Sequence, residues 1–567
     1  MSIINVFFVN HPVAGISNPY TSVDMRRFDT AWWPAGSSAV GELLASDIDM
    51  DWPIDANGHP LNGRLASSYS DDFYHRIHIT PSALDLGNII STQTQAVNIW
   101  NAYLTPQQLT SIEGEQEGIE LTGQPTPPLT FTALQEREWT VAITPDGPAV
   151  LDTQLQWVFS NGDTADLAIT GNRITAFTWA PDWANGIRER LIWATDIMQS
   201  PRGAEQRRAI RLAPRRELNA DLIVDGRERQ AFDMAMFGWG ARIWAVPIWP
   251  EIQLLSSGVD AGALEIPCDT SHLDFRDNGL ALLRGETSFH YETVEIQSIA
   301  ADALTLKRPL QMSWPAGTRL YPARTARLSQ VPELARKTDM MQTASVNFEV
   351  MEPSDWPAVM PATTYRSFPV YDAVPEESQD LTSSFANLTL LLDNGSAIPR
   401  LQDTSGKAMP VLLHRWQLYG RAERAAFRSF LYALDGRRVP VWIPTHADDL
   451  TLVATITSNA AVMDIAAIGY TRFAQTKVGR WDIRIWLRDG SVFYRRITAA
   501  AEISTEVERL VIDSSFGITI TPDDVMRISF LQLVRSDSDS VEIEHVTDSE
   551  GVARAQQIFK GVRDDDI

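Results

Sequence analysis

Two stretches of the sequence repeat one pattern, and this repeat constrains the fold more than any other feature. Gly226–Pro250 reads GRERQAFDMAMFGWGARIWAVPIWP, and Gly420–Pro444 reads GRAERAAFRSFLYALDGRRVPVWIP. Each begins with Gly-Arg, passes through a charged and apolar helical pattern around a phenylalanine, and reaches Val-Pro-x-Trp. Phe232 and Phe427 lie 195 residues apart (427 − 232 = 195). A repeated supersecondary unit indicates a repeated module, so we expect two copies in this chain.

The repeated pattern predicts one helix in each copy. In the first copy Asp225 is a candidate N-cap, apolar residues recur at helical spacing, and Gly238 and Gly240 end the helix. In the second copy the pattern predicts a helix over 421–434, with Gly436 just beyond its end. The charged pairs Glu-Arg in both helices suit either a helix surface or a subunit contact.

A strand is expected after each helix. The Val-Pro-x-Trp motif aligns Val246 with Val439, 193 residues apart (439 − 246 = 193). Pro247 and Pro250 restrict the first of these strands to a sheet edge or a bend, because proline lacks the backbone donor. Large aromatic side chains in these segments are interpreted as packing anchors: Phe232, Trp244, Trp249, Phe427 and Trp442.

Short strand patterns surround both motifs in matching order. In the first copy, strand patterns cover 203–224, 263–267, 280–285, 291–299, 303–308, 318–328 and 346–352. In the second copy, they cover 411–420, 481–490, 491–498, 508–513 and 524–535. We therefore place copy one at 176–352 and copy two at 406–567. Residues 353–405 are rich in Pro, Ser, Asp and Asn and are assigned to a linker that carries one strand at 387–393.

The N-terminal third has a different character. Residues 1–71 combine several prolines and tryptophans with one helical piece at 37–46, which predicts an ordered, extended arm. Residues 72–175 contain seven short strand patterns separated by turn signals, which is typical of an immunoglobulin-like β-sandwich. The predicted fold class is therefore mainly β: an Ig-like sandwich and two barrel or sandwich modules, each with one flanking helix.

Composition limits the classes of partner. The formal net charge is −24, which disfavours gripping nucleic acid, because that requires a basic surface. No apolar run is long enough to predict a membrane span, and the N-terminal segment lacks the basic start of a signal peptide. Cys268 is the only cysteine, so an intrachain disulfide is impossible and synthesis in a reducing cytoplasm is expected.

The sequence offers no catalytic motif, and we expect no enzyme activity and no cofactor. Phosphate-binding loops, nucleophile elbows and His-Glu-x-x-His patterns are absent from it. His75 and His78 are interpreted as lying on opposite faces of one strand, a poor ligand pair. A calcium site at the acidic group Asp537, Asp539, Glu542, Glu544 and His545 is weighed against a solvated hairpin, which is favoured. Cys268 is expected to be a buried structural thiol.

At the repeated module the chain resembles tail-tip proteins of long, non-contractile-tailed bacteriophages, such as Mu-like Pseudomonas siphophages. The first copy, from GAEQRRAIRL at 203–212 to AVPIW at 245–249, is similar to a distal-tail protein pattern. The segment 531–562 is similar to the C-terminal hairpin of such proteins. Copy two departs from the pattern because it lacks the Gly-x-Glu-x-Arg strand. The resemblance covers about 190–567 and leaves the arm and the Ig-like domain outside the family core.

This resemblance implies a structural protein of the virion, located at the tail tip or baseplate and assembled in the host cytoplasm. Such modules share the tail-tube fold and form a ring around a DNA channel. Because a tail tube is six-fold, two modules per chain favour a homotrimer with pseudo-six-fold symmetry, with a homohexamer as the alternative. The implied neighbours are the tail tube protein, other hub or baseplate proteins and tail fibres, and DNA would pass the acidic channel without specific binding. The competing hypothesis is a receptor- or glycan-binding module that uses the Ig-like domain, and an envelope-degrading enzyme is the third.

Overall fold

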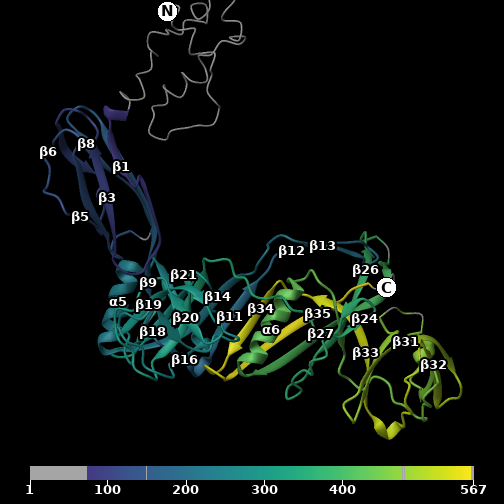
Figure 1. Cartoon of the computed structure of the whole chain (residues 1–567). Coiled ribbons are helices and arrows are strands. Elements are labelled where there is room, and N and C mark those ends of the chain that lie inside the picture. The colour runs from purple at the N-terminus through teal and green to yellow at the C-terminus, as the bar shows by residue number, and fades with distance from the viewer. Residues whose placement is uncertain (1–72, 149, 397, 476, 478, 564–567) are drawn as a thin grey trace, which may run out of the picture. The chain divides into compact units, whose positions relative to one another are not determined.

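The computed structural model describes residues 73–148, 150–396, 398–475, 477 and 479–563 (Figure 1). The expected arm at 1–71 and its helix at 37–46 lie outside these residues. The described part of the chain is mainly β, with 50% of the described residues in strands, as the sequence predicts. It divides into two compact units, 1–174 and 175–567, which are described separately below. Among the described residues, none of the helices has the length and apolar character needed to cross a membrane.

The first unit is a two-layer β-sandwich. One sheet has the order β1-β3-β7-β5, formed by Ile77–Thr80, Gln93–Asn101, Glu136–Ile143 and Ile119–Thr122. The other has the order β2-β9-β8-β4-β6, formed by Ala83–Ile89, Thr164–Ala176, Val150–Phe159, Gln107–Glu113 and Leu129–Phe131. Strands alternate apolar and polar residues, so the inward faces bury one core around Trp139 and Trp157. Their rings meet edge to face at 6.0 Å.

The second unit begins with β10 (Pro181–Asp182), the 3₁₀ turn η3 (Trp183–Asn185) and β11 (Ile187–Ile192). The hairpin β12 (Thr195–Gln199) and β13 (Glu205–Ala209) follows, and then β14 (Arg215–Asp225) leads into helix α5 (Gly226–Trp239). After α5 come β15 (Ile243–Pro247), the 3₁₀ turn η4 (Trp249–Glu251), β16 (Gln253–Leu254), β17 (Glu265–Pro267), β18 (Leu280–Arg284), β19 (Tyr291–Ile299) and β20 (Ala303–Leu306). β21 (Arg319–Leu328), β22 (Leu334–Arg336) and β23 (Met341–Val350) complete module one, which we define as β11 to β23.

The small hairpin β24 (Thr364–Tyr365) and β25 (Phe368–Pro369) precedes the second copy. β26 (Ser383–Leu392) and β27 (Arg400–Tyr419) lead into helix α6 (Gly420–Leu434). Then come β28 (Val441–Pro444), β29 (Val462–Ala466), α7 (Tyr470–Phe473), β30 (Asp482–Leu487), β31 (Val492–Glu502), β32 (Val507–Ile512) and the 3₁₀ turn η5 (Pro522–Asp524). β33 (Val525–Ser536), β34 (Ser540–His545) and β35 (Val552–Gly561) end module two, defined as β26 to β35.

The two modules share their strand pairing, apart from the short β16–β21 pair, which has no counterpart among the described residues of module two. β14 pairs with β11 and β23, as β27 pairs with β26 and β35. β21 pairs with β15, β18 and β23, as β33 pairs with β28, β30 and β35. The remaining pairs β17–β20, β18–β19, β19–β20 and β22–β23 correspond to β29–β32, β30–β31, β31–β32 and β34–β35. One helix follows the central strand in each, so the repeat extends well beyond the sequence motif. No closed barrel forms among the described residues.

Three details differ from the sequence interpretation. Residues 353–405 are not only a linker, because β26 and the first part of β27 form a long hairpin there. The Val-Pro-x-Trp alignment is wrong by four residues: β15 places Pro247 opposite Ala323, and β28 places Pro444 opposite Leu531 at the matching ladder position. Pro247 therefore corresponds to Pro444 (444 − 247 = 197). Trp442 lies in a strand, whereas Trp249 lies in η4.

The helix boundaries follow the prediction closely. α5 begins directly after Asp225, but the side chain of Asp225 makes no capping hydrogen bond. The helix also runs through Gly238 before it ends at Trp239. α6 begins at Gly420, and its C-cap Asp435 is in the left-handed region, followed by Gly436 at φ 63°. Glycine suits this position because it has no Cβ to clash there.

Candidate functional site

The two modules join into one continuous sheet, and this joint is the candidate functional site. β11 of module one pairs antiparallel with β34 of module two, from Ile187 opposite His545 to Ile192 opposite Ser540. The strand order through the joint is β22-β23-β14-β11-β34-β35-β27-β26. We call the β11–β34 pair and the side chains buried around it the junction. In Figure 1, β11 and β34 lie beside α6.

One face of this sheet carries a polar row across both modules, and Ile223 and Ile558 are the exposed apolar residues of β14 and β35 on the same face. A cross-strand row on this face passes without a break from β23 to β27 through Asn347, Asn219, Arg188, Glu544, Arg554 and Gln417. The alternate residues of β14, such as Leu218 and Leu222, are buried on the opposite face, where α5 and α6 contact the sheet. The open face therefore carries charges of both signs and amide groups.

A carboxylate is buried at the centre of the junction. Glu189 on β11 is 1% exposed and forms ion pairs with Arg216 at 2.8 Å and Arg428 at 2.9 Å. The imidazole of His545 on β34 lies 3.0 Å from the same carboxylate. Glu189 belongs to module one, whereas Arg428 and His545 belong to module two. The carboxylate therefore ties β11 to both α6 and β34.

The charges continue from Glu189 into a larger buried group. Arg428 also donates to Glu251 at 2.8 Å, and Glu251 accepts from the backbone N–H of Asp274. Asp274 accepts from Arg216 and Arg324, both almost fully buried. We call the following seven residues the ionic cluster: Glu189, Arg216, Glu251, Asp274, Arg324, Arg428 and His545.

Neighbouring arginines keep two carboxylates of the cluster, Glu189 and Asp274, in the charged form. Burial alone would raise the pKa of Glu189, but Arg216 and Arg428 lower that pKa well below its usual range. The same balance lowers the pKa of Asp274, chiefly through Arg324 and Arg216. Burial lowers the pKa of His545, which favours the neutral ring that donates from Nε2 to Glu189. A buried charge group of this kind specifies one geometry, because removing any partner leaves an uncompensated charge.

A second set of contacts fixes the start of β12 on module two. Asp539 accepts from the backbone N–H and the hydroxyl of Thr195 at 2.8 and 2.7 Å, and it pairs with Arg437 at 3.1 Å. The β12–β13 hairpin, which we call arm one, then extends across module two (Figure 1). Glu205 in arm one forms a buried ion pair with Arg535 at 2.7 Å.

The tip of arm one also contacts module two. The hydroxyl of Thr404 donates to the Pro201 carbonyl at 2.6 Å, and Arg563 donates to the Arg202 carbonyl at 2.7 Å. Arm one is therefore held on module two from its base to its tip.

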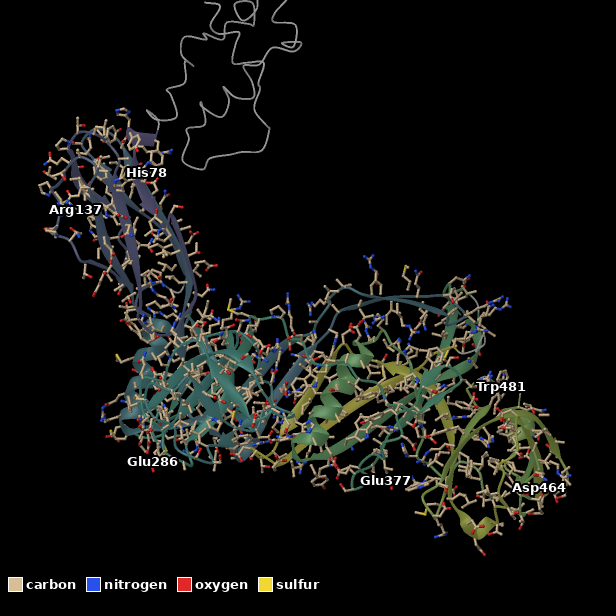
Figure 2. The ribbon with its side chains drawn as sticks, viewed as in Figure 1. His78, Arg137, Glu286, Glu377, Asp464 and Trp481 are labelled. Carbon is tan, nitrogen blue, oxygen red and sulfur yellow. The ribbon has the colours of Figure 1, made fainter. Side chains whose placement is uncertain are left out.

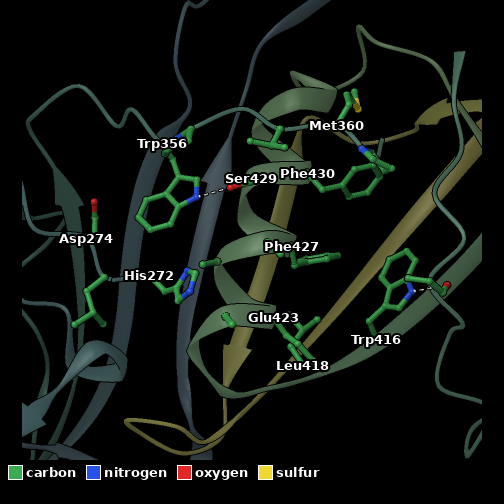
Figure 3. Close-up of a pocket in the computed structure, with 18 of the residues that line it drawn as sticks. His272, Asp274, Trp356, Met360, Trp416, Leu418, Glu423, Phe427, Ser429 and Phe430 are labelled. Atoms are coloured by element: carbon green, nitrogen blue, oxygen red, sulfur yellow. Dashed lines mark hydrogen bonds between the residues drawn. The ribbon is translucent and has the colours of Figure 1, made fainter. Parts of the chain in front are cut away.

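A groove of about 1310 Å³ lies beside α6 (Figure 3). It lies between the module-one loop at 272–277, the segment 355–374 and the α6 face that carries Phe427 and Phe430. Its two indole groups are bonded within the chain: Trp356 donates to Ser429 at 2.9 Å and Trp416 donates to the Ala373 carbonyl at 3.3 Å. The guanidinium of Arg428 lies 4.7 Å from the Trp356 ring. These contacts fix α6 against the segment that carries Trp356. We assign the groove no ligand.

All five anchors named from the sequence are buried: Phe232, Trp244, Trp249, Phe427 and Trp442. The structure brings the first three together, because Phe177 contacts Phe232, Trp244 and Trp249 with ring centroids 5.8 to 6.4 Å apart. Phe427 packs with Trp416 in the module-two core, and Trp442 lies apart from it beside Tyr365. Their role in assembly stays a prediction.

The other candidate groups have structural contacts. His75 precedes β1, so the two histidines do not share a strand as expected, and His78 stacks on Trp100 at 5.3 Å. Among the described residues, no group of three or more potential ligands could hold a metal ion. Cys268 is half-buried and not fully buried as expected, and this partial burial raises the pKa of its thiol to about 12. Acidic side chains are spread over the second unit, as the labels Glu286, Glu377 and Asp464 in Figure 2 illustrate.

The acidic group weighed as a calcium site, for which a solvated hairpin was favoured, makes contacts within the second unit, and His545 in it is buried. Asp539 and His545 make the contacts described above, and Glu542 lies 3.8 Å from Arg188 across the β11–β34 pair. Asp537 pairs with Arg535 at 3.3 Å. The ionic cluster itself was missed from the sequence. The alternation of β11 could have indicated part of it. Glu189 lies on the same face of the strand as Ile187 and Leu191, so it is a charged residue in an otherwise apolar row.

The sequence matches no protein family model. No curated protein matches it either.

Proposed function

We propose that this chain is a ring-forming structural protein that lines a channel, and that the ring belongs to the tail tip or baseplate of a long-tailed bacteriophage. The observation that carries the proposal is the joining of two modules with corresponding strand pairing, head to tail, into one sheet. A head-to-tail contact uses two different surfaces, so it can be repeated by further modules until a ring closes. Two modules per chain favour a trimer with six module positions.

The polar face of the sheet supports a water-filled channel. The row from Asn347 to Gln417 crosses six strands of both modules without an apolar side chain. Mixed charges and amides would hydrate a lumen without a strong attraction for phosphate. The net charge of −24 acts in the same direction over the whole chain. On this proposal DNA passes the ring and is not specifically bound.

The experiment is negative-stain electron microscopy of the purified full-length chain, combined with mass measurement in solution. A particle of three chains with a central channel and six similar densities is the expected result. A homohexamer with the second modules at the periphery is the alternative arrangement. A chain that stays monomeric up to high concentration and is absent from purified phage particles would contradict the proposal.

A glycan-binding role for the first unit is the second candidate, and one observation favours it. Tyr74, His78 and Trp100 form a partly exposed aromatic group, in which Tyr74 and Trp100 rings meet at 6.4 Å. Exposed aromatic surface marks interaction sites. Binding of a cell-surface glycan by the full chain, lost in Trp100→Ala with ring formation intact, would assign this role to the first unit. No binding across a glycan array would remove it.

A further inference from the structure

The strand pairing shows which residue of module two corresponds to each residue in the first strands of module one. Gly226 and Gly420 both open a helix with positive φ, and they are 194 residues apart (420 − 226 = 194). Leu218 pairs with Phe348, and Leu412 pairs with Phe559, again at 412 − 218 = 194. The same offset therefore relates β14 to β27.

This offset continues through the arms without a gap. Thr195 pairs with Ala209 in arm one, and Thr389 pairs with Asp403 at the same two positions 194 residues later. We call the distal part of the β26–β27 hairpin, 389–403, arm two. Glu189 of β11 corresponds to Ser383 of β26, because their partners Leu218 and Leu412 correspond. The segment 381–386 is thus the counterpart of β11.

The counterpart of β34 is β22. β34 places Glu544 opposite Arg554 of β35, and β22 places Ala335 opposite Thr343 of β23. Thr343 and Arg554 occupy matching positions, since their strands are aligned by Phe348 and Phe559. Leu334, Ala335 and Arg336 therefore correspond to Ile543, Glu544 and His545.

The two counterparts lack the partner that the junction supplies. β11 has a strand on each side, as does β34, because they pair with each other. Among the described residues, β26 pairs with β27 alone and β22 pairs with β23 alone. These two strands are the opposite ends of the continuous sheet. A free strand edge is a template for another chain, and it needs protection or a partner.

Apolar side chains are exposed at both ends of the sheet. Phe385 of β26 is 60% exposed, whereas its counterpart Leu191 of β11 is completely buried in the module-two core. Arm two exposes Leu390, Leu391, Leu392, Ile398 and Leu401. At the module-one end, Val331 and Met340 flank β22 and are also exposed. Exposed apolar groups on an unpaired strand are unusual for a surface that faces only water.

We propose that the unpaired edge at 381–386 of one chain pairs with β22 of a second copy of the same chain, in the register of the β11–β34 junction. In the junction, Glu189 lies opposite Ile543 and Arg188 lies opposite Glu544. Replacing each residue by its counterpart places Ser383 opposite Leu334 and Thr382 opposite Ala335. Phe385 then takes the place of Leu191 and is covered by module one of the second copy. This interface rests on the proposed ring and names the surface that closes it.

Arm two extends the same contact. In arm one, the tip residue Pro201 accepts from Thr404 at the base of the next module's hairpin. The counterpart of Thr404 is Ile210 (404 − 194 = 210), which is exposed together with Leu212 and Met198. The leucines of arm two therefore meet an apolar patch on the second copy. Arm one likewise has apolar neighbours on module two, because Gly203 lies beside Met409 and Leu388.

Cysteine pairing in the full-length chain tests the register. Directly opposed Cα atoms in antiparallel strands are about 4.5–5.5 Å apart, which is within the range that a disulfide spans. The variant T382C/A335C is expected to give a covalent ring on oxidation, seen as a ladder ending at three chains in non-reducing electrophoresis. T382C alone, with the native Cys268, and the out-of-register variant S384C/A335C serve as controls and should remain uncross-linked.

Phe385→Glu tests the interface independently, with Phe473→Glu as the matched control. Phe473 is 68% exposed and lies 5.1 Å from Arg472, and Phe385 lies 5.5 Å from Arg480 in the same way. Phe385→Glu should weaken self-association at least tenfold by mass photometry, and Phe473→Glu should leave it unchanged. Oligomers that persist in Phe385→Glu and give no T382C/A335C cross-link would overturn this interface and leave the ring standing. A chain that never associates would overturn both.

Discussion

Replacing Arg428 by methionine removes the cation that links α6 to two carboxylates of module one. Arg428 donates to Glu251 at 2.8 Å and to Glu189 at 2.9 Å, and its side chain is 7% exposed. Methionine fills a similar volume, so the loss of charge dominates over the loss of packing. Glu189 keeps Arg216 and His545, but Glu251 loses the cation with which it forms its ion pair.

The magnitude follows from burial. Breaking a buried ion pair by removing one partner costs about 3–5 kcal/mol, because the remaining charge is left without compensation in a site that water does not reach. The same junction contains a matched exposed pair, Arg188 and Glu542, 3.8 Å apart with both side chains 54% exposed. Removing Arg188 should cost about 0–1 kcal/mol, since water screens this pair. Both arginines join the same two modules, so their difference isolates burial.

The assay is urea unfolding of the full-length chain, with hydrogen exchange resolved to β11 and β34. We expect Arg428→Met to lower the free energy of unfolding several-fold more than Arg188→Met and to raise exchange in both strands. Adding Glu251→Gln to Arg428→Met should recover part of the loss, which gives a coupling energy from a double-mutant cycle. Equal effects of the two single variants, or no coupling to Glu251, would refute the reasoning.

Three further predictions concern the second unit. Trp442→Ala should cost about 3–5 kcal/mol, because the side chain is fully buried, and a loss below about 1 kcal/mol in urea unfolding would contradict this. Gly436→Ala places a Cβ 2.5 Å from Asp539 Oδ1 and 2.7 Å from Trp193 Cβ. It should therefore cost more stability than the control Gly490→Ala, where φ is also positive but no atom lies within 4 Å of the new Cβ. Equal melting temperatures of the two variants would contradict this. Burial lowers the pKa of His446 to about 3 from an ordinary value near 6.5, so the unfolded chain binds the extra proton between these values and stability falls as pH decreases below about 6.5. His446→Asn, which suits the positive φ there, should therefore lose about 2 kcal/mol less than the wild type between pH 7 and pH 5, and parallel pH profiles would exclude this role.

The positions of individual strands are easier to predict from the sequence than the residues at which each module begins and ends. Strand patterns such as 291–299 match β19 residue for residue, because alternation along a half-buried strand depends on local burial alone. The start of module two was missed, since the segment that corresponds to β11 lies within the assigned linker. Ser383 stands where Glu189 stands in module one, and Phe385 stands where Leu191 stands, so sequence identity has been lost while the pairing remains.

The junction could not be predicted for a different reason. Its partners Glu189 and His545 are separated by 356 residues, and no local pattern specifies which distant strand will pair with β11. The alternation of β11 indicates that Glu189 points inward, but the partners of its carboxylate lie on β14, α6 and β34. Long-range pairing is therefore visible only in the folded chain. The same holds for the alignment of the two Val-Pro-x-Trp motifs, which the ladder positions of Pro247 and Pro444 correct by four residues.

The distance between β11 and β34 along the chain also sets when the junction can form. During synthesis β11 leaves the ribosome long before β34, because Ser540 follows Ile192 by 348 residues (540 − 192 = 348). Module one can pair β11 with β14 early, but the outer edge of β11 and the carboxylate of Glu189 stay open until β34 has emerged. A nascent or truncated chain that ends before β34 thus exposes an unpaired strand edge with a charge meant for burial, which is the kind of intermediate that aggregates or recruits chaperones. The junction therefore waits for the β34–β35 hairpin, however early module one folds.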